Sequence, residues 1–292
     1  MNLANLRDQY RALLVDGFAP FWLKHGIDWE HGGVLSCMKE DGAPVSGDKY
    51  IWSQARSVWA FSALYNRIEP NPEWLRVAEN SVRFLLEHGR DEQGRWVYHT
   101  TREGLVVDGP ISIYADCFVV YGLSEYLRAV RDEKLLALAR ATYDRVVARV
   151  EQPDFHEVAP YPWPPHRRFQ AVSMMLTEMT NELIVTTGDR SLETILDRHV
   201  ERVMQRFVRP QRKLLFEFLS EDWQELPPPE GTAVMPGHAI ECMWFVMHVA
   251  ARRGDRELAR RAAEVVRWHL EAGWDPEYGG IFLGIDAEGH AP

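Results

Sequence analysis

Apolar residues recur at helical spacing along most of the chain, and short polar turns interrupt them. This pattern predicts helices over residues 3–25, 51–68, 73–88, 113–130, 133–150, 169–187, 191–207, 237–253 and 256–272. Some of these helices, such as 237–253, are apolar nearly all round, whereas others, such as 256–272, carry an apolar stripe opposite a charged face. A helix that is apolar all round is buried, and a striped helix lies at the surface. We therefore expect helix pairs in an inner and an outer layer.

The turns between the helices repeat along the sequence. Residues 28–35 and 275–282 both contain an acidic residue, a Gly-Gly pair and a short apolar strand. Weaker copies begin at Asp91 and Pro210, and the spacing of about 60 residues indicates a repeat architecture. Together with the two layers, the repeats predict an all-α fold: an (α/α)6 toroid with short β-hairpins between helix pairs, formed by residues 1–292 as a single domain.

The number of helices predicts that this toroid is incomplete. A closed ring of six helix pairs needs twelve helices, and the pattern indicates about nine, which is roughly three quarters of a ring. The flanks of the first and last pairs would then expose contiguous apolar surface. Such surface usually marks an interaction site or a tendency to aggregate, so we expect the chain to associate, for example as a homodimer.

Composition excludes several classes of function. The formal net charge of −10 argues against nucleic-acid binding and against an acidic membrane surface. No apolar run approaches the ~20 residues of a membrane-spanning helix, and the first residues lack the apolar core of a signal peptide. Cys37, Cys117 and Cys242 are widely spaced, which suits a reducing compartment and suggests neither disulfides nor a zinc site. We expect a cytoplasmic protein that uses no metal or other cofactor.

Polar residues at the starts of the inner helices are the candidates for chemistry. Trp52 and Arg56 are four residues apart and therefore share one helix face. An arginine on a mostly apolar helix must find a partner or a polar ligand, so a structural ion pair and a binding site are both open interpretations. Tyr114 and Asp116 open another inner helix with a hydroxyl and a carboxylate, although Asp116 could equally be an ordinary acid in a first turn.

The segment from Pro236 to Glu241 is the sharpest local motif. Pro236 and Gly237 start a helix and place His238 in its first turn, where the helix dipole disfavours the imidazolium form. We therefore expect His238 to be a neutral base or a hydrogen-bond partner. Glu241 lies one turn further along the same face. The alternative interpretation is a capping contact between the two side chains with no chemistry.

Other residues give weaker indications. Met174 and Met175, at the matching place in the third inner helix, predict core packing or an apolar wall. His156 and His166 flank a proline-rich loop and form only a faint metal pair, because no acidic residue or cysteine nearby completes the spacing. The sequence has no glycine-rich phosphate loop and no serine nucleophile motif.

Taken together, the motifs resemble the N-acylglucosamine 2-epimerase family, which also contains mannose isomerases and cellobiose 2-epimerases. The resemblance covers essentially the whole chain. It is carried by Asp28-x-Glu30-x-Gly32-Gly33, Tyr50-x-Trp52-x-Gln54-x-Arg56-x-x-Trp59, Tyr114-Ala115-Asp116-Cys117-Phe118, Met174-Met175-Leu176, Pro236-Gly237-His238-x-x-Glu241 and Gly273-Trp274-Asp275-Pro276-Glu277-Tyr278-Gly279-Gly280. The family fold is an (α/α)6 toroid, and its members move a proton at the carbon next to the carbonyl of an open-chain, non-phosphorylated sugar.

The resemblance implies roles for individual residues. His238 would be an acid/base residue, and Arg56 would bind the sugar oxygens and stabilise the enediolate. Trp52, Tyr114 and Glu241 would line the pocket. Cellobiose-type members carry a histidine where this chain has Met174-Met175-Leu176, so Met175 would be a substrate-binding residue and the chain would belong to the acylglucosamine branch or to an uncharacterised one.

The resemblance also implies a missing part. Family members continue past the last Gly-Gly turn to a final helix that opens with His-x-Pro-Arg and holds a second catalytic histidine. We therefore expect weak activity or none from residues 1–292. Two other functions stay open from the sequence: a non-catalytic carbohydrate-binding remnant, and an (α/α)6 glycoside hydrolase that uses Asp116 and Glu241 as its two carboxylates.

Overall fold

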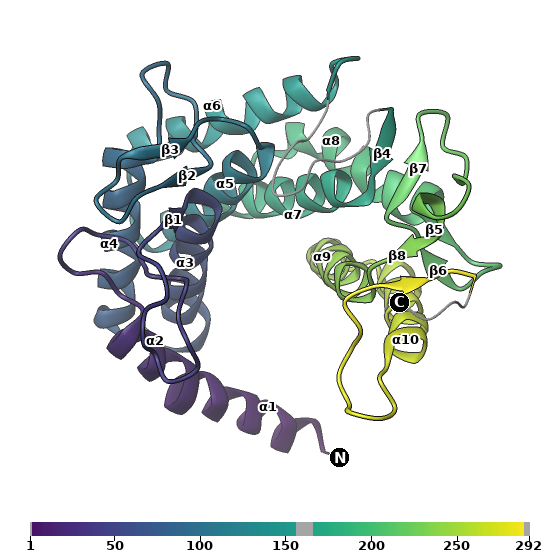
Figure 1. Ribbon diagram of the computed structural model, residues 1–292, viewed down its shortest axis with the longest axis horizontal. Coiled ribbons are helices and arrows are strands. Elements are labelled where there is room, and N and C mark those ends of the chain that lie inside the picture. Colours follow the sequence, from purple (N-terminus) through teal and green to yellow (C-terminus); the bar gives the residue numbers. More distant parts are fainter. Residues whose placement is uncertain (1, 156–165, 289–292) are drawn as a thin grey trace. The chain divides into compact units, whose positions relative to one another are not determined.

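The computed structural model describes residues 2–155 and 166–288, which form two compact units (Figure 1). The first unit runs from the N-terminus to Glu151, and the second comprises residues 152–155 and 166–288. Both units consist of helices joined by short β-hairpins, as the sequence predicts. In the described parts of the chain, none of the helices is long and apolar enough to cross a membrane. The interpretation of residues 1–292 as a single domain stays a prediction.

The first unit contains two layers of helices. Its helices are α1 (Leu3–Ala12), α2 (Ala19–His25), α3 (Ile51–Ala63), α4 (Pro72–His88), α5 (Ile113–Ala129) and α6 (Glu133–Val150). π-helical segments join α1 to α2 and extend α3 as far as Ile68. The apolar helices α3 and α5 pack against each other, and each also packs against a striped helix, α4 and α6 respectively (Figure 1). The predicted pairing of inner and outer helices is confirmed in this unit.

The second unit repeats this arrangement. It contains α7 (Gln170–Thr187), α8 (Glu193–Glu201), α9 (Pro236–Arg253) and α10 (Arg256–Gly273), and a π-helical segment extends α8 to Phe207. The inner helices α7 and α9 pack against each other, α7 also packs against α8, and α9 against α10. When segments that run on without a break are taken as one helix, all nine predicted helices are present within residues 2–155 and 166–288.

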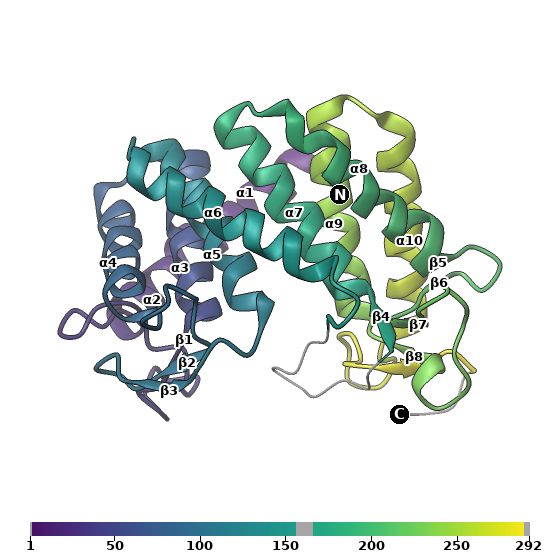
Figure 2. The same ribbon diagram turned by 90° about the horizontal axis from the view of Figure 1, so that it is seen from above.

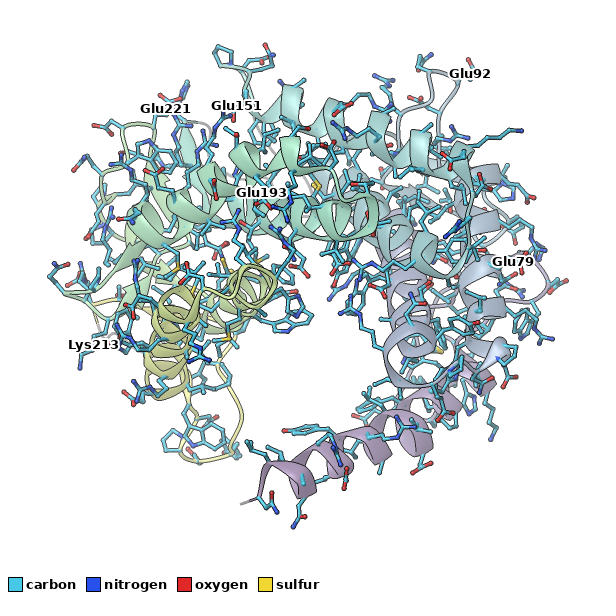
Figure 3. The ribbon with its side chains drawn as sticks, turned by 180° about the vertical axis from the view of Figure 1, so that it is seen from behind. Glu79, Glu92, Glu151, Glu193, Lys213 and Glu221 are labelled. Carbon is cyan, nitrogen blue, oxygen red and sulfur yellow. The ribbon has the colours of Figure 1, made fainter. Side chains whose placement is uncertain are left out.

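An ion pair ties the outer helix α8 to the inner helix α9. Glu193, labelled in Figure 3, begins α8, and its two carboxylate oxygens accept hydrogen bonds from Arg252 at 2.5 and 3.0 Å. Arg253 donates a further bond to the same carboxylate. The hydrogen bond from Arg252 is the largest of the causes that lower the pKa of Glu193 to about 2. The C-terminal end of α9 is thereby fixed against its neighbour.

Side-chain caps set where several helices begin. The capping residues accept hydrogen bonds from the first backbone N–H groups of the helix that follows: Asn71 for α4, Ser112 for α5, Asp132 for α6 and Asp255 for α10. Gly188 and Gly254 end α7 and α9 in the left-handed conformation, at φ +72° and +70°. Local sequence therefore defines the helix boundaries that carry the candidate site residues.

Short strands lie at the ends of the helices, as Figure 2 shows for each unit. In the first unit β1 (Lys49–Tyr50), β2 (His99–Thr100) and β3 (Val106–Asp108) form an antiparallel sheet in that order. In the second unit the antiparallel pairs are β4 (Arg167–Phe169) with β7 (Phe218–Ser220), β5 (Val208–Arg209) with β6 (Leu214–Leu215), and β8 (Ala233–Val234) with β9 (Ile285–Asp286). Strands β1, β4 and β8 lead into α3, α7 and α9 and so position the first turns of these inner helices.

The two Gly-Gly turns have the same backbone, which confirms the predicted repeat. Gly32 and Gly33 have φ of +82° and +72°, and Gly279 and Gly280 have +75° and +90°, values that glycine adopts without strain. The N–H of the aspartate that opens each turn donates to the carbonyl of the second glycine, at 3.0 Å in both copies. A weaker copy closes with a bridge between Arg90 and Trp96.

Buried charge surrounds the first turn. Lys49 donates to Asp28 Oδ2 at 2.9 Å and to the Gly32 carbonyl at 2.7 Å, and the side chains of Lys49 and Asp28 are almost fully buried. Arg102 adds a bond to Asp28 at 2.9 Å. Burial alone would raise the pKa of Asp28, but the bonds from Arg102 and Lys49 outweigh it and hold this pKa well below its ordinary value. Asp28 is therefore a carboxylate at neutral pH.

Candidate active site

The first turn of α9 presents His238 at the surface of the second unit. Met235 is extended and follows β8, and Pro236 occupies the first position of the helix, where its missing N–H costs nothing. His238 then stands in the first turn, with its side chain 36% exposed. The predicted start of this helix is confirmed to within one residue.

A buried carboxylate forms a hydrogen bond with the His238 ring on the side that faces the protein interior. Nδ1 of His238 lies 3.1 Å from Oε1 of Glu217, and the Glu217 side chain is only 2% exposed. Glu217 lies in the short connection between β6, which pairs with β5, and β7, which pairs with β4, and it is 21 residues earlier in the chain than His238. Sequence reasoning missed this residue, because no periodicity links a glutamate between two short strands to the start of a later helix. The only available signal is the turn motif predicted from Pro210 onward, which locates the β5–β6 hairpin just before Glu217 but not the contact of Glu217 with His238.

The electrostatics of His238 correct the expectation from its position in the helix. The hydrogen bond with Glu217 raises the pKa of His238 above its ordinary value, burial acts in the opposite direction, and the negative charge of Glu241 adds to the rise. A helix N-terminus by itself disfavours imidazolium. A carboxylate in direct contact is the stronger influence, so the local dipole does not decide the charge of this ring.

Glu241 and Trp244 follow His238 along α9. Glu241 is three residues after His238, and Trp244 is three residues after Glu241, so the members of each successive pair are neighbours on the helix surface. Glu241 is half-buried, and Trp244 is 40% exposed, with its ring edge-on to His248 at 4.5 Å between centroids. The sequence analysis did not single out Trp244, although its spacing from Glu241 was a usable signal. An exposed indole beside ionisable groups is a suitable surface for a sugar ring.

The remaining predicted residue of the second unit is Met175 on α7. It is 2% exposed and belongs to the core, so packing is the role that the structure describes. Contact of Met175 with a sugar stays a prediction. Of the faint metal pair, His156 lies outside the described residues, and His166 has its Nδ1 3.3 Å from Oε1 of Glu221.

One group of side chains in the described residues has donor atoms close enough together to hold a metal ion. Glu178 and Glu182 on α7 and His248 on α9 each offer one ligand atom, and these atoms lie within 4.8 Å of one another. Nδ1 of His248 is 2.9 Å from Oε1 of Glu178. The imidazole and the carboxylate therefore bind each other in this structure.

In the first unit, Trp52 and Arg56 line a cavity of about 660 Å³. The guanidinium of Arg56 lies over the rings of Trp52 and Phe118, at 5.6 and 5.1 Å from their centroids. Arg56 is exposed and forms no ion pair with any residue that the structure describes, so the structural ion pair is not the arrangement found. Trp22 and Trp59 contribute further aromatic walls. A cavity of this size, apolar with a few polar groups, is typical of small-molecule sites.

Tyr114 is half-buried in the first turn of α5, which Ser112 caps. Trp52, Arg56 and Tyr114 thus belong to the first unit, whereas His238, Glu241 and Met175 belong to the second. Each set comes from the starts of inner helices, as predicted. Whether the two sets serve one pocket stays a prediction, as does the pairing of Asp116 with Glu241 that a glycoside hydrolase would need.

Comparison with solved structures identifies the fold. The structure of a cellobiose 2-epimerase from Bacillus thermoamylovorans superposes with a TM-score of 0.82 at 20% sequence identity, covering 97% of this chain and 76% of the other. A glycoside hydrolase family 76 α-mannanase from Bacteroides thetaiotaomicron gives a TM-score of 0.65 at 12% identity, covering 90% and 71%. These likenesses confirm the predicted fold class, the α/α toroid.

Comparison of sequences identifies the family. The N-acylglucosamine 2-epimerase of Bos taurus is 33% identical over 290 residues, which are 95% of this chain and 68% of the bovine protein. A mannose-6-phosphate isomerase from Rhizobium meliloti is 25% identical over 264 residues, covering 86% and 66%. The family model described as N-acylglucosamine 2-epimerase (GlcNAc 2-epimerase) matches residues 33–292. The chain belongs to the N-acylglucosamine 2-epimerase family.

Proposed function

We propose that this protein is a sugar epimerase or isomerase that moves a proton at the carbon next to the carbonyl of an open-chain sugar. The observation that carries the proposal is the pairing of His238 with Glu217 at the start of α9, a half-exposed imidazole backed by a buried carboxylate. Such a pair is suited to general acid–base catalysis. The named activities of the family members, epimerases and isomerases of sugars, support the same conclusion.

The proposed reaction begins with the C–H bond next to the sugar carbonyl. His238 takes the proton, and the electron pair of the broken bond moves through the adjacent carbon to the carbonyl oxygen, giving an enolate, which is an enediolate when the deprotonated carbon carries a hydroxyl group. Return of a proton to carbon then completes either epimerisation at the same carbon or isomerisation at its neighbour. Glu241, which neighbours His238 on the surface of α9, and Trp244, which neighbours Glu241, are suited to hold the sugar ring and its hydroxyl groups.

The other assignments rest on the family resemblance. We propose that Arg56 binds the sugar oxygens and stabilises the enediolate, and that Trp52, Tyr114, Glu241 and Met175 line the substrate site. The exposed guanidinium and the aromatic cavity around it support a binding role for Arg56. A cytoplasmic location and a homodimer are likewise proposals from the sequence.

The substrate that we propose first is an N-acylated amino sugar without a phosphate group. The identity to the bovine N-acylglucosamine 2-epimerase, 33%, exceeds the 25% to the mannose-6-phosphate isomerase of Rhizobium meliloti, which supports this choice. A free monosaccharide, a phosphorylated one and a disaccharide are the alternatives that experiment must separate.

The experiment is proton exchange followed by NMR in deuterated water. The protein is incubated with N-acetylglucosamine, mannose, mannose 6-phosphate and cellobiose, and we expect deuterium to enter the position next to the carbonyl of one of them slowly, in keeping with the weak activity that the resemblance implies for residues 1–292. His238→Gln should lower the exchange rate about 10²–10⁴-fold, the usual contribution of a general base. Exchange that continues unchanged in His238→Gln would refute the role of His238.

A further inference from the structure

We infer that Glu217 is a positioning residue for His238: it keeps the proton of the neutral imidazole on Nδ1 and so makes Nε2 the nitrogen that exchanges a proton with the sugar. The inference rests on the proposed function of His238 and adds which ring nitrogen works and what selects it. It also assigns a role to a residue that lies in no motif of the sequence.

The direction of the hydrogen bond fixes the tautomer. An ionised carboxylate can only accept, so the contact of 3.1 Å between Nδ1 and Glu217 Oε1 requires a proton on Nδ1. The other ring nitrogen of a neutral imidazole then carries the lone pair. Because Glu217 is 2% exposed and His238 is 36% exposed, the carboxylate lies on the protein side of the ring. The accessible edge of the ring is left for Nε2.

Backbone hydrogen bonds hold Glu217 in place on both sides. Its N–H donates to the carbonyl of Ala233 at 3.4 Å, and its carbonyl accepts from the N–H of Gln170 at 3.0 Å. Gln170, which is fully buried, also reaches the carbonyl of His238 with its side-chain amide at 3.5 Å. The connection between β6 and β7 that carries Glu217, the start of α7 and the start of α9 are thereby joined at one point. This framework lets the carboxylate set the angle of the ring.

The two carboxylates near His238 allow the effect of a hydrogen bond on its tautomer to be distinguished from the effect of negative charge on its pKa. Two carboxylates act on the ring, Glu217 from the connection between β6 and β7 and Glu241 from α9. The neighbouring Cys242 is fully buried, and burial raises the pKa of its thiol well above the ordinary value. Both carboxylates favour the protonated ring, but only Glu217 is hydrogen-bonded to it. Loss of the Glu241 charge should therefore lower the pKa of His238 and leave its tautomer alone. Loss of the Glu217 charge should change both.

The protein contains a matched reference pair on the same helix. Nδ1 of His248 lies 2.9 Å from Oε1 of Glu178, the glutamate side chain is fully buried, and the histidine side chain is 26% exposed. His248 is ten residues after His238, which is about 15 Å along a helix. The two pairs are similar in geometry and separate in space, so each can report on the fold while the other is altered.

The test is NMR of the full chain with ¹⁵N-labelled histidine, with the His238 signals assigned from His238→Gln. In the unaltered protein above the pKa of His238, we expect the proton on Nδ1. Glu217→Gln should move part or all of it to Nε2 and lower the pKa, Glu241→Gln should lower the pKa only, and Glu178→Gln should change His248 only. A tautomer of His238 that is the same in Glu217→Gln and in the unaltered protein would overturn the inference.

Turnover supplies an independent readout on whichever sugar exchanges deuterium. Glu217→Gln should lower kcat by roughly the inverse of the fraction of molecules that keep the proton on Nδ1, with little change in KM, because only those molecules have the lone pair on Nε2 while the sugar contacts remain. Glu217→Asp should recover part of this loss. A Glu217→Gln protein with intact His248 signals and full kcat would contradict the inference. If no sugar is turned over, the proposed function fails, and the tautomer measurement still decides the role of Glu217.

Discussion

The turn at residues 28–33 and the turn at residues 275–280 share a backbone and differ in their surroundings. In both turns, the aspartate side chain accepts hydrogen bonds from two backbone N–H groups inside the turn. A backbone hydrogen bond then closes each loop across nine residues: the N–H of Leu35 donates to the carbonyl of Gly26, and the N–H of Phe282 donates to the carbonyl of Gly273. Asp28, however, is 2% exposed beneath Lys49 and Arg102. In the later turn Tyr278 is 84% exposed.

The difference shows which part of a turn is encoded locally. Aspartate and paired glycines are sufficient for the backbone, because the same bonds form in a covered and in an uncovered copy. Burial depends on residues that are distant in sequence, such as Lys49 and Asn80, whose side chains bond backbone carbonyls of the first turn. We therefore expect equal substitutions in the two copies to have unequal effects on stability.

The largest difference is expected for removal of the two aspartates. Asp28→Ala leaves the fully buried Lys49 without its carboxylate, which costs about 3–5 kcal/mol of unfolding free energy. Asp275→Ala loses two bonds from backbone N–H groups at the surface and should cost about 1 kcal/mol. Urea unfolding followed by circular dichroism measures both. Similar losses for the two variants would break the comparison.

A smaller difference is expected for the second glycine of each turn. A Cβ at Gly33 would lie 2.3 Å from Oε1 of Gln54. The side-chain amide of Gln54 is held there because it accepts from the N–H of Val34 and donates to the carbonyl of Val34. A Cβ at Gly280 would meet nothing within 4 Å. Gly280→Ala should therefore cost only the strain of a positive φ, about 1 kcal/mol, and Gly33→Ala about 3 kcal/mol.

Gln54→Ala provides the control for the glycine pair. In that background the contact with Gln54 is gone and a contact of 3.2 Å with Cγ of Phe84 remains, so the cost of Gly33→Ala should fall most of the way to that of Gly280→Ala. A double-mutant cycle on unfolding free energies measures this coupling. A cost of Gly33→Ala that is unchanged in the Gln54→Ala protein would mean that the backbone, and not Gln54, makes the first turn intolerant.

Low pH should remove part of the stability that Asp28 contributes to the first turn. The pKa of Asp28 is lowered in the folded protein, so its contribution to stability is complete above the ordinary aspartate pKa of about 4 and is lost as pH falls through the folded value. The stability gap between the unaltered protein and Asp28→Asn should be constant near neutral pH and narrow below about pH 4. Thermal unfolding from pH 7 to pH 3 measures the gap. A gap that widens in acid would contradict the sign of the shift.

The smallest difference is expected for the aromatic residues of the turns. The guanidinium of Arg76 lies 4.5 Å from the ring centroid of Trp29, whereas Tyr278 is mostly exposed. Trp29→Ala should cost about 0.5–1 kcal/mol and Tyr278→Ala close to nothing. Thermal unfolding near neutral pH resolves the pair, and Arg76→Ala should reproduce most of the loss seen in Trp29→Ala.

Sequence patterns predicted the parts of this protein that depend on near neighbours. The inner helices begin at Ile51 and Ile113 as expected, and at Gln170 and Pro236, one residue from the prediction. At α7 the shift arises because Phe169 pairs with Phe218 as the last residue of β4. Periodicity and turn chemistry report such features because both act over a few residues.

The parts that the sequence did not predict depend on contacts between distant segments. Glu217 reaches His238 across 21 residues and reverses the effect that the helix start alone has on the pKa of the ring. Lys49 and Arg102 meet at Asp28 in the same way. Joint action of Arg56 and His238 on one substrate stays a prediction, since the two residues belong to different units.

The short span of the bonds that close the turns has a consequence for the order of folding. Leu35 and Gly26 are nine residues apart, and loops of about ten residues close in roughly 10–100 ns. Lys49 and Arg102 come to Asp28 from 21 and 74 residues away, so they arrive after a much larger part of the chain has assembled. Substitutions inside the first turn should therefore slow folding, and substitutions of Lys49 should mainly speed unfolding. The kinetic φ-value of a substitution is the ratio of its effect on the folding barrier to its effect on the unfolding free energy. Kinetic φ-values near zero in the turn and near one at Lys49 would contradict this order of folding.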